Sequence, residues 1–188
     1  MIRSDTIVSA EQYMTKRTTP RILFLLPALL FAADSSGVRP RDDRSQYAVA
    51  MFNQSLALAA ELVPPDKVRK QFGSAVDSRY LVVEVGMFPK ARGPLEIRPG
   101  NFILRVNRTR DTISASVPKA IEELSETPKP VATELEAKCL PETSTDKPVA
   151  GYLYFPVRDK KDGDNEYELE YKAQRTWMIL PLHAGTLR

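Results

Sequence analysis

Residues 80–88 read YLVVEVGMF, an almost unbroken run of aliphatic and aromatic residues that ends at Pro89. β-Branched and aromatic side chains favour strands because they pack well on a pleated surface, and proline cannot continue a sheet ladder. Alternation along the strand predicts one buried face, formed by the odd-numbered residues Leu81, Val83, Val85 and Met87. The segment therefore predicts a β-strand with one side in a core.

Similar patterns recur on both sides of this strand. In residues 166–172, glutamate alternates with tyrosine and leucine, the period-two pattern of an antiparallel strand with one solvated face. Residues 47–63, rich in Ala, Leu and Val, fit a strand or a helix, and we assign them to a strand. The other predicted strands cover residues 101–107, 111–115, 150–157 and 176–182.

Short helices and one long connection lie between the predicted strands. Residues 65–73 and 116–125 each carry proline at or near the first helical turn, which favours short helices. Residues 126–148 hold four prolines and few large apolar residues, which predicts a mobile excursion with at most a turn of helix at 133–138. Because strands and helices do not alternate as βαβ units, the pattern indicates an all-β fold with short helices, built as an antiparallel sandwich of two sheets.

The N-terminal region has the order of a signal peptide. Three basic residues at positions 16, 17 and 21 precede the apolar run 22–33, which is too short to span a bilayer and ends in Ala32 and Ala33. We expect residues 14–33 to direct export across a bacterial inner membrane to the periplasm or the medium, with cleavage near Ala33 and Met14 as the better start. The predicted organisation is an extension and signal peptide at 1–33, a flexible leader at 34–45 and one sandwich domain at 46–184. A buried core helix at 22–33 and a retained membrane anchor are the alternatives.

The charge and cysteine content narrow the class of protein. The formal net charge is +3, but residues 1–33 hold four of the 27 basic residues and two of the 24 acidic ones. The remainder is nearly neutral with interspersed signs, so a nucleic-acid partner is not expected. The single cysteine, Cys139, allows no intramolecular disulfide.

No familiar catalytic motif occurs in the sequence: it has no nucleophile elbow, phosphate-binding glycine loop, dinucleotide fingerprint or HExxH pair. The only histidine, His183, lies near the C-terminus, where it is a poor partner for Cys139 in nucleophilic catalysis. Carboxylates crowd residues 159–166 and could attract Ca²⁺, but Asp162-Gly163 is explained by a hairpin turn and two lysines oppose a cation. We expect no enzyme activity, no metal and no cofactor.

Aromatic residues concentrate in the last third of the chain and fit either core packing or a binding platform. Strand alternation sends about half of them inward. Tyr152 and Tyr154 share one face of their predicted strand, so they are the candidate partner-binding surface.

Several strand motifs together resemble a known group of proteins. They include VAGYLYFP at 149–156, YELEY at 167–171 and MILPL at 178–182, together with the strands at 80–85 and 101–106. Over residues 79–182 the chain resembles exported bacterial immunoglobulin-like domains of unknown function. The resemblance implies an immunoglobulin-like sandwich and brings no catalytic residues with it.

These observations lead us to expect an exported, non-enzymatic immunoglobulin-like module that binds a protein or envelope component and has no membrane span after signal cleavage. The long excursion at 126–148 is the first place to look for a partner, since loops carry much of protein function. A membrane-tethered accessory subunit of an envelope complex is one alternative. A hydrolase of unfamiliar type is the other.

Overall fold

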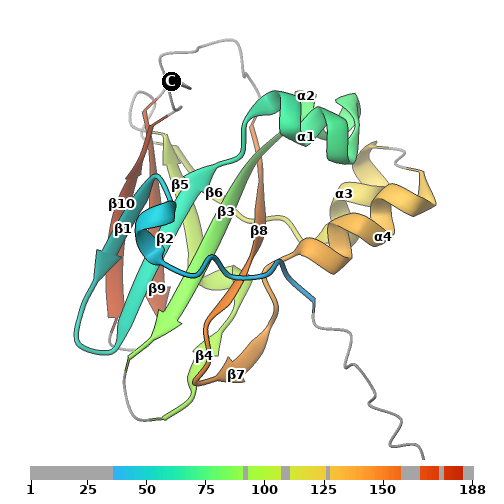
Figure 1. The fold of residues 1–188 in the computed structure, drawn as a ribbon. Helices are drawn as coiled ribbons and strands as arrows, with labels where there is room; N and C mark the ends of the chain where they lie inside the picture. The colour runs from blue at the N-terminus through green and yellow to red at the C-terminus, as the bar shows by residue number, and fades with distance from the viewer. Residues whose placement is uncertain are drawn as a thin grey trace, which may run out of the picture. The chain divides into compact units, whose positions relative to one another are not determined.

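The computed structural model describes residues 36–90, 93–106, 111–125, 128–157, 166–173 and 176–183. Within them the chain is mostly antiparallel β-sheet with short helices (Figure 1). Sheet I has the order β1-β2-β3-β8, and its strands are β1 (Val49–Phe52), β2 (Leu56–Leu62), β3 (Tyr80–Pro89) and β8 (Val149–Pro156). Sheet II has the order β10-β9-β5-β6, and its strands are β5 (Phe102–Val106), β6 (Asp111–Ser114), β9 (Tyr167–Ala173) and β10 (Thr176–Leu182).

The predicted strands are confirmed, with one refinement near the N-terminus. Residues 47–63 form a hairpin of two strands rather than one strand. The Asn53 side chain makes the turn, because its Oδ1 accepts hydrogen bonds from the backbone N–H groups of Ser55 (2.9 Å) and Leu56 (2.8 Å).

The chain crosses between the two sheets several times. After β3 it leaves sheet I for β5 and β6, returns to sheet I as β8 beside β3, and crosses again to β9 beside β5. One apolar core fills the space between the sheets, since alternate residues of β2, β3 and β8 meet alternate residues of β5, β9 and β10 there. The large fully buried side chains of this core include Phe102, Phe155 and Tyr171.

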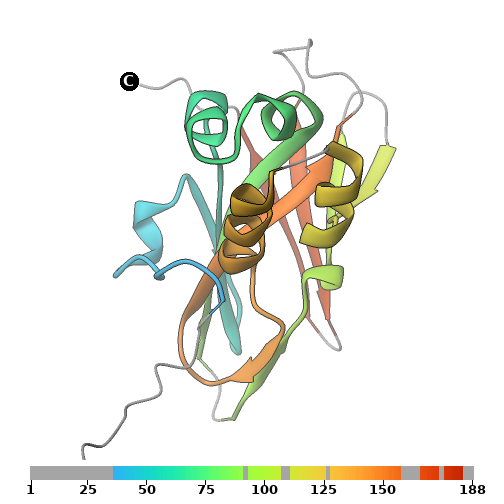
Figure 2. The same ribbon diagram turned by 90° about the vertical axis from the view of Figure 1, so that its right-hand side faces the viewer.

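Four short helices lie over the outer face of sheet I, in front of β3 and β8 in Figure 2. They are α1 (Pro65–Phe72), α2 (Ser74–Arg79), α3 (Pro118–Ser125) and α4 (Lys129–Lys138). A second apolar core joins Phe72, Ile121 and Leu135 of the helices to Tyr80 and Val82 of β3. None of the helices in the described segments is long and apolar enough to cross a bilayer.

The second core corrects the prediction that β3 has a single buried face. Val83, Val85 and Met87 face the core between the sheets, as expected, but Tyr80 and Val82 are also buried, against the helices. A strand covered on both faces reads as a continuous apolar run rather than an alternating one, which explains the composition of residues 80–88.

Residues 128–145 differ from the mobile excursion that their composition predicted. They form α4 and the short strand β7 (Thr143–Thr145), which pairs with β4 (Leu95–Ile97). Two of the few apolar residues there, Leu135 and Leu140, are buried. Proline does not disrupt α4, because it lies in the first turn, where the backbone N–H has no partner within the helix.

Three separate segments cover the outer edge of β8. Their backbone N–H groups donate to the carbonyl groups of alternate β8 residues, as Val38 to Ala150 (2.9 Å), Leu140 to Tyr152 (3.0 Å) and Ser116 to Tyr154 (2.7 Å). An edge strand with unmade hydrogen bonds can pair with another chain, and these contacts remove that risk for β8. Val38 belongs to the predicted flexible leader, so the described part of that leader is attached to sheet I.

Gly151 permits the close approach of residues 139–140 to β8. A Cβ atom at position 151 would collide with the backbone of Leu140 and would lie 2.8 Å from the carbonyl carbon of Cys139. We expect Gly151→Ala to lower the free energy of unfolding by at least about 2 kcal/mol, because backbone atoms cannot move aside as a side chain can.

Gly100→Ala is the matched control, since nothing lies within 4 Å of a Cβ atom there. Urea denaturation of both variants measures the difference. Equal stability of the two variants would contradict the packing of residues 139–140 against β8.

Candidate functional site

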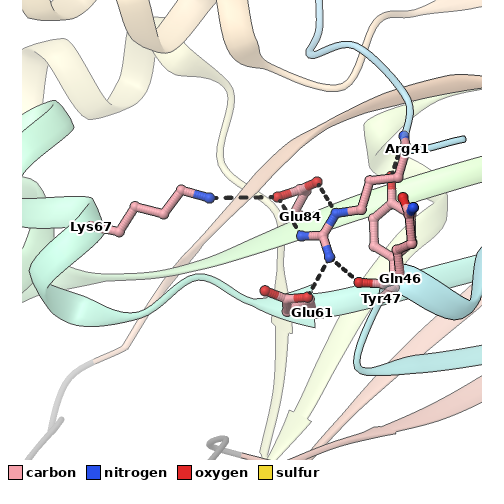
Figure 3. Close-up of polar contacts among 6 residues, drawn as sticks. All are labelled: Arg41, Gln46, Tyr47, Glu61, Lys67 and Glu84. Atoms are coloured by element: carbon pink, nitrogen blue, oxygen red, sulfur yellow. Dashed lines mark hydrogen bonds and ion pairs between the residues drawn. The ribbon is translucent and has the colours of Figure 1, made fainter. Parts of the chain in front are cut away.

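A polar cluster on the outer face of sheet I centres on Arg41 (Figure 3). Its guanidinium donates through Nη1 to Glu61 Oε2 (2.8 Å), and through Nε and Nη2 to the two oxygens of Glu84 (3.2 and 3.1 Å). The ring of Tyr47 lies 4.3 Å from the guanidinium carbon, and Lys67 Nζ approaches Glu84 Oε2 at 3.9 Å. Arg41 therefore bridges two carboxylates and stacks on an aromatic ring.

Strand register explains why an arginine is needed there. Glu61 of β2 and Glu84 of β3 are directly opposite each other, so both carboxylates project from the same face of the sheet. Like charges directly opposite across a sheet are destabilising. Arg41, carried by the segment before β1, neutralises the pair and ties that segment to the sheet.

The pKa values in and beside the cluster follow from burial and from these charges. Burial opposes the charge of Arg41, but hydrogen bonds and attraction from Glu61 and Glu84 outweigh it and raise the pKa of the guanidinium. Burial, reinforced by Glu84, raises the pKa of Tyr152 to about 12. Burial also raises the pKa of Tyr47. The arginine stays charged and the phenols stay neutral, which suits a clamp rather than a proton-transfer site.

A second cluster presents an exposed indole on the outer face of sheet II. Trp177 is 65% exposed, yet its Nε1 donates to Glu170 Oε1 at 2.8 Å. The other oxygen of Glu170 accepts from Arg105 Nε at 2.6 Å and lies 2.5 Å from Arg105 Nη2. Glu170 is nearly buried beneath these two side chains. The ring is thus fixed while its surface stays open to solvent.

Tyr152 and Tyr154 do not form the exposed surface that the sequence predicted. They share one face of β8, as expected, but they are only 4% and 0% exposed because the helices cover that face. Phe72 packs edge-on against both rings, at centroid distances of 6.0 and 5.9 Å, and the Tyr154 hydroxyl donates to the carbonyl of Leu135 (3.1 Å).

The fold separates Cys139 from His183. Cys139 lies beside β8 at one edge of sheet I, whereas His183 follows β10, the edge strand of sheet II that runs beside β1 at the opposite edge of sheet I. Burial, reinforced by Glu136, raises the pKa of the Cys139 thiol to about 11. The thiol is therefore protonated at neutral pH and is a weak nucleophile.

The acidic stretch weighed as a Ca²⁺ site lies largely outside the described residues, as does the signal segment 14–33. Glu166, its one described carboxylate, is exposed. In the described segments, no three His, Cys, Asp or Glu side chains come together as a metal site would require.

Sequence reasoning missed both clusters, although each left a signal. Glu84 interrupts an apolar run whose neighbours on both sides are buried, and a charge in such a position requires a partner. Trp177 occupies an outward position in the alternation of β10. Its partners Glu170 and Arg105 come from two other strands, so no local pattern connects them.

Comparison with known proteins gives one distant structural likeness. No family model matches the sequence, and no curated protein matches it. Among solved structures, the chain is similar to one described as "a putative lipoprotein" from Bacillus subtilis subsp. subtilis, with 18% identity and a TM-score of 0.45. The similarity covers 71% of this chain and 38% of that one, so the chain spans well under half of its length.

The Arg41 clamp should contribute measurably to stability. We expect Arg41→Met to lower the free energy of unfolding by about 2–3 kcal/mol, because it leaves the nearly buried Glu84 carboxylate without its main partner. Adding Glu84→Gln should restore part of the loss by removing the uncompensated charge.

Arg98→Met is the matched control, since Arg98 pairs with Glu96 in an exposed position where an ion pair contributes less than about 1 kcal/mol. Chemical denaturation of the unmodified chain and the three variants measures these changes. A loss for Arg41→Met no larger than that for Arg98→Met would contradict a stabilising clamp.

Cys139 should react slowly while the protein is folded. A pKa of about 11, compared with an ordinary 9.0, lowers the thiolate fraction at pH 8 by a factor of about 100. Iodoacetamide labelling followed by intact mass should therefore be about a hundredfold slower in native buffer than in 8 M urea, where the thiol is unfolded and exposed. Similar rates in both conditions would show that the thiol is not held as described.

Proposed function

We propose that the chain is an exported, non-enzymatic binding module of the bacterial envelope with an immunoglobulin-like fold. It recognises a protein or envelope component through the outer face of sheet II, with Trp177 as the anchor. The observation that carries this proposal is an indole that is mostly exposed and yet held in one orientation by Glu170 and Arg105.

The strand order supports the immunoglobulin-like assignment. In one sheet of that fold, the second strand lies between the first and the fifth. In the other sheet, the sixth strand lies between the third and the seventh, and variable-type domains add an edge strand beside the third. Here β3 lies between β2 and β8, β5 lies between β9 and β6, and β10 lies beside β9. Leaving out β1, β4 and β7, the sequence of crossings between the sheets is the same, although no described strand corresponds to the fourth strand of that fold, which would lie beyond β8.

Rigid aromatic side chains on open surfaces are typical of binding interfaces. An aromatic ring offers a large contact area, and fixing it before binding reduces the conformational entropy that association would otherwise cost. Trp177 meets both conditions. Its environment also lacks the large charge imbalance of a nucleic-acid site, since Glu170 and Arg105 neutralise each other.

The protonation state and pairing of the buried polar groups support a non-enzymatic role. The carboxylates of Glu84 and Glu170 accept hydrogen bonds from arginines, and the thiol of Cys139 is held protonated by burial. A nucleophile requires a base within hydrogen-bond reach. These groups instead serve to neutralise charge and fill the core.

Export is the first element of the proposal to test. The full chain is expressed in a Gram-negative host, the cells are fractionated, and the product is analysed by intact mass and N-terminal sequencing. We expect a periplasmic protein that begins near Asp34. Retention of residues 14–33 in the membrane fraction would favour the tethered accessory subunit, and a cytosolic product that keeps them would exclude export.

Binding through Trp177 is tested by site-specific photocrosslinking in the same host. A photoreactive benzoylphenylalanine is placed at Lys172, which is exposed and directly opposite Trp177 across β9 and β10, or, as the control, at Val117, which is 61% exposed and lies outside sheet II. We expect one dominant crosslinked species from position 172 alone, weakened by Trp177→Ala, which removes the anchor. Equal crosslinking from both positions would contradict a binding surface at Trp177.

A further inference from the structure

Two adjacent apolar side chains at the end of β1 lie exposed to solvent. Phe52 is 63% exposed and Met51 is 39% exposed. Phe52 lies directly opposite Ala57 of β2, and the neighbours of that alanine, Leu56 and Leu58, point into the core between the sheets. Because side chains alternate along a strand, Ala57 and Phe52 face outward. Phe52 belongs to neither apolar core, so its ring is exposed without completing one.

The turn that follows Phe52 is held in a fixed position. It lies at the end of sheet I away from α1 and α2 (Figure 1). Besides the hydrogen bonds to the Asn53 side chain, the backbone N–H of Lys90, directly after β3, donates to the carbonyl of Ser55 (2.8 Å). β10 of sheet II runs beside β1, so the exposed feature is the side chains at this end and not a strand backbone.

Two cations flank the exposed ring. Lys90 Nζ lies 4.6 Å and the Arg44 guanidinium carbon 5.2 Å from the centroid of the Phe52 ring. Within the described segments, neither cation forms an ion pair with a carboxylate, in contrast to the arginines of the two clusters above. Asp43, the acid next to Arg44 in the sequence, caps the 3₁₀ turn, where its Oδ1 accepts from the backbone N–H of Ser45 (2.6 Å).

An anionic lipid surface matches this combination of an exposed ring and unpaired cations. A ring at the boundary between headgroups and acyl chains loses contact with water, and cations beside it are attracted to the lipid phosphates. Lysine and arginine can lay their alkyl stems along apolar surface while their charged ends reach the headgroups. The same cations would repel a second copy of this end, and lysine is depleted at protein–protein interfaces. Charge and shape therefore favour lipid over a protein partner.

We propose that the end of the β1–β2 hairpin is a docking site for an anionic phospholipid surface. Phe52, with Met51 beside it, enters the boundary between headgroups and acyl chains, while Lys90 and Arg44 contact the headgroup phosphates. One ring and two charges give a weak, reversible attachment. It goes beyond the proposed recognition through Trp177 and does not depend on it.

A fluorescent label in the turn tests the docking geometry directly. In the chain purified from the expression host, Cys139→Ser removes the natural thiol, and Gln54→Cys introduces one at an exposed position that carries the environment-sensitive dye nitrobenzoxadiazole. With vesicles of equal parts phosphatidylglycerol and phosphatidylcholine, we expect the emission to rise and to be quenched by lipids with a nitroxide near the headgroup. Sodium chloride at 0.5 M should reverse the rise, because salt screens the attraction. The same dye at Lys119→Cys, exposed on α3, is the matched control and should not respond.

Co-sedimentation with the same vesicles measures the contribution of each group. We expect Phe52→Ser to weaken partitioning about tenfold, because burial of an aromatic side chain contributes at least this much. The double variant Arg44→Gln, Lys90→Gln should weaken it about 25-fold, since each cation near an anionic surface contributes about fivefold. Val117→Ser and Lys119→Gln, also exposed, are the matched controls and should leave partitioning unchanged. Because all these side chains are exposed, circular dichroism should confirm that each variant folds.

Three results would overturn the proposal. The first is equal partitioning of the hairpin variants and their controls. The second is a label in the turn that responds as strongly to pure phosphatidylcholine vesicles, since charge would then play no part. The third is an emission that rises with protein concentration without vesicles, which would indicate a protein contact at this end. All these measurements use purified protein, so they do not depend on the outcome of the export and crosslinking experiments.

Discussion

The burial of β3 and β8 on both faces is the constraint on which the rest of this structure depends. One face of each strand closes the core between the sheets, and the other supports the four helices. Both strands must therefore be almost entirely apolar, and every polar group among them needs a partner. The helices have only six to ten residues each, so they depend on this face for their positions.

The Arg41 cluster follows from that constraint. Glu61 and Glu84 are opposite each other on a face that is otherwise apolar, and only a cation brought from outside the sheet can neutralise both. The segment that carries Arg41 also places Val38 on the edge of β8 and Tyr47 over Gly86, where any Cβ atom would lie 2.6 Å from the tyrosine hydroxyl. One charged contact thus attaches about ten residues to the domain.

The outer face of sheet II has the opposite character. The second core, which joins the helices to sheet I, contains no residue of sheet II. Trp177 lies exposed on the outer face of sheet II, where Glu170 and Arg105 orient it. The described part of the chain therefore has one side where helices cover sheet I and an exposed indole on the opposite side, beyond both cores.

The sequence by itself determined most strand positions, the two helices that begin near proline, and the antiparallel class of the fold, because these depend on local alternation and on residues that stop an element. It failed for residues 128–145, where two buried leucines outweigh a composition typical of loops, and for Tyr152 and Tyr154, whose exposure depends on helices distant in sequence. Only the tertiary structure joined Arg41 to Glu61 and Glu84, and Trp177 to Glu170 and Arg105. The physical reason is that strand register and edge coverage bring together residues with no periodic relation along the chain, so local patterns carry no information about them.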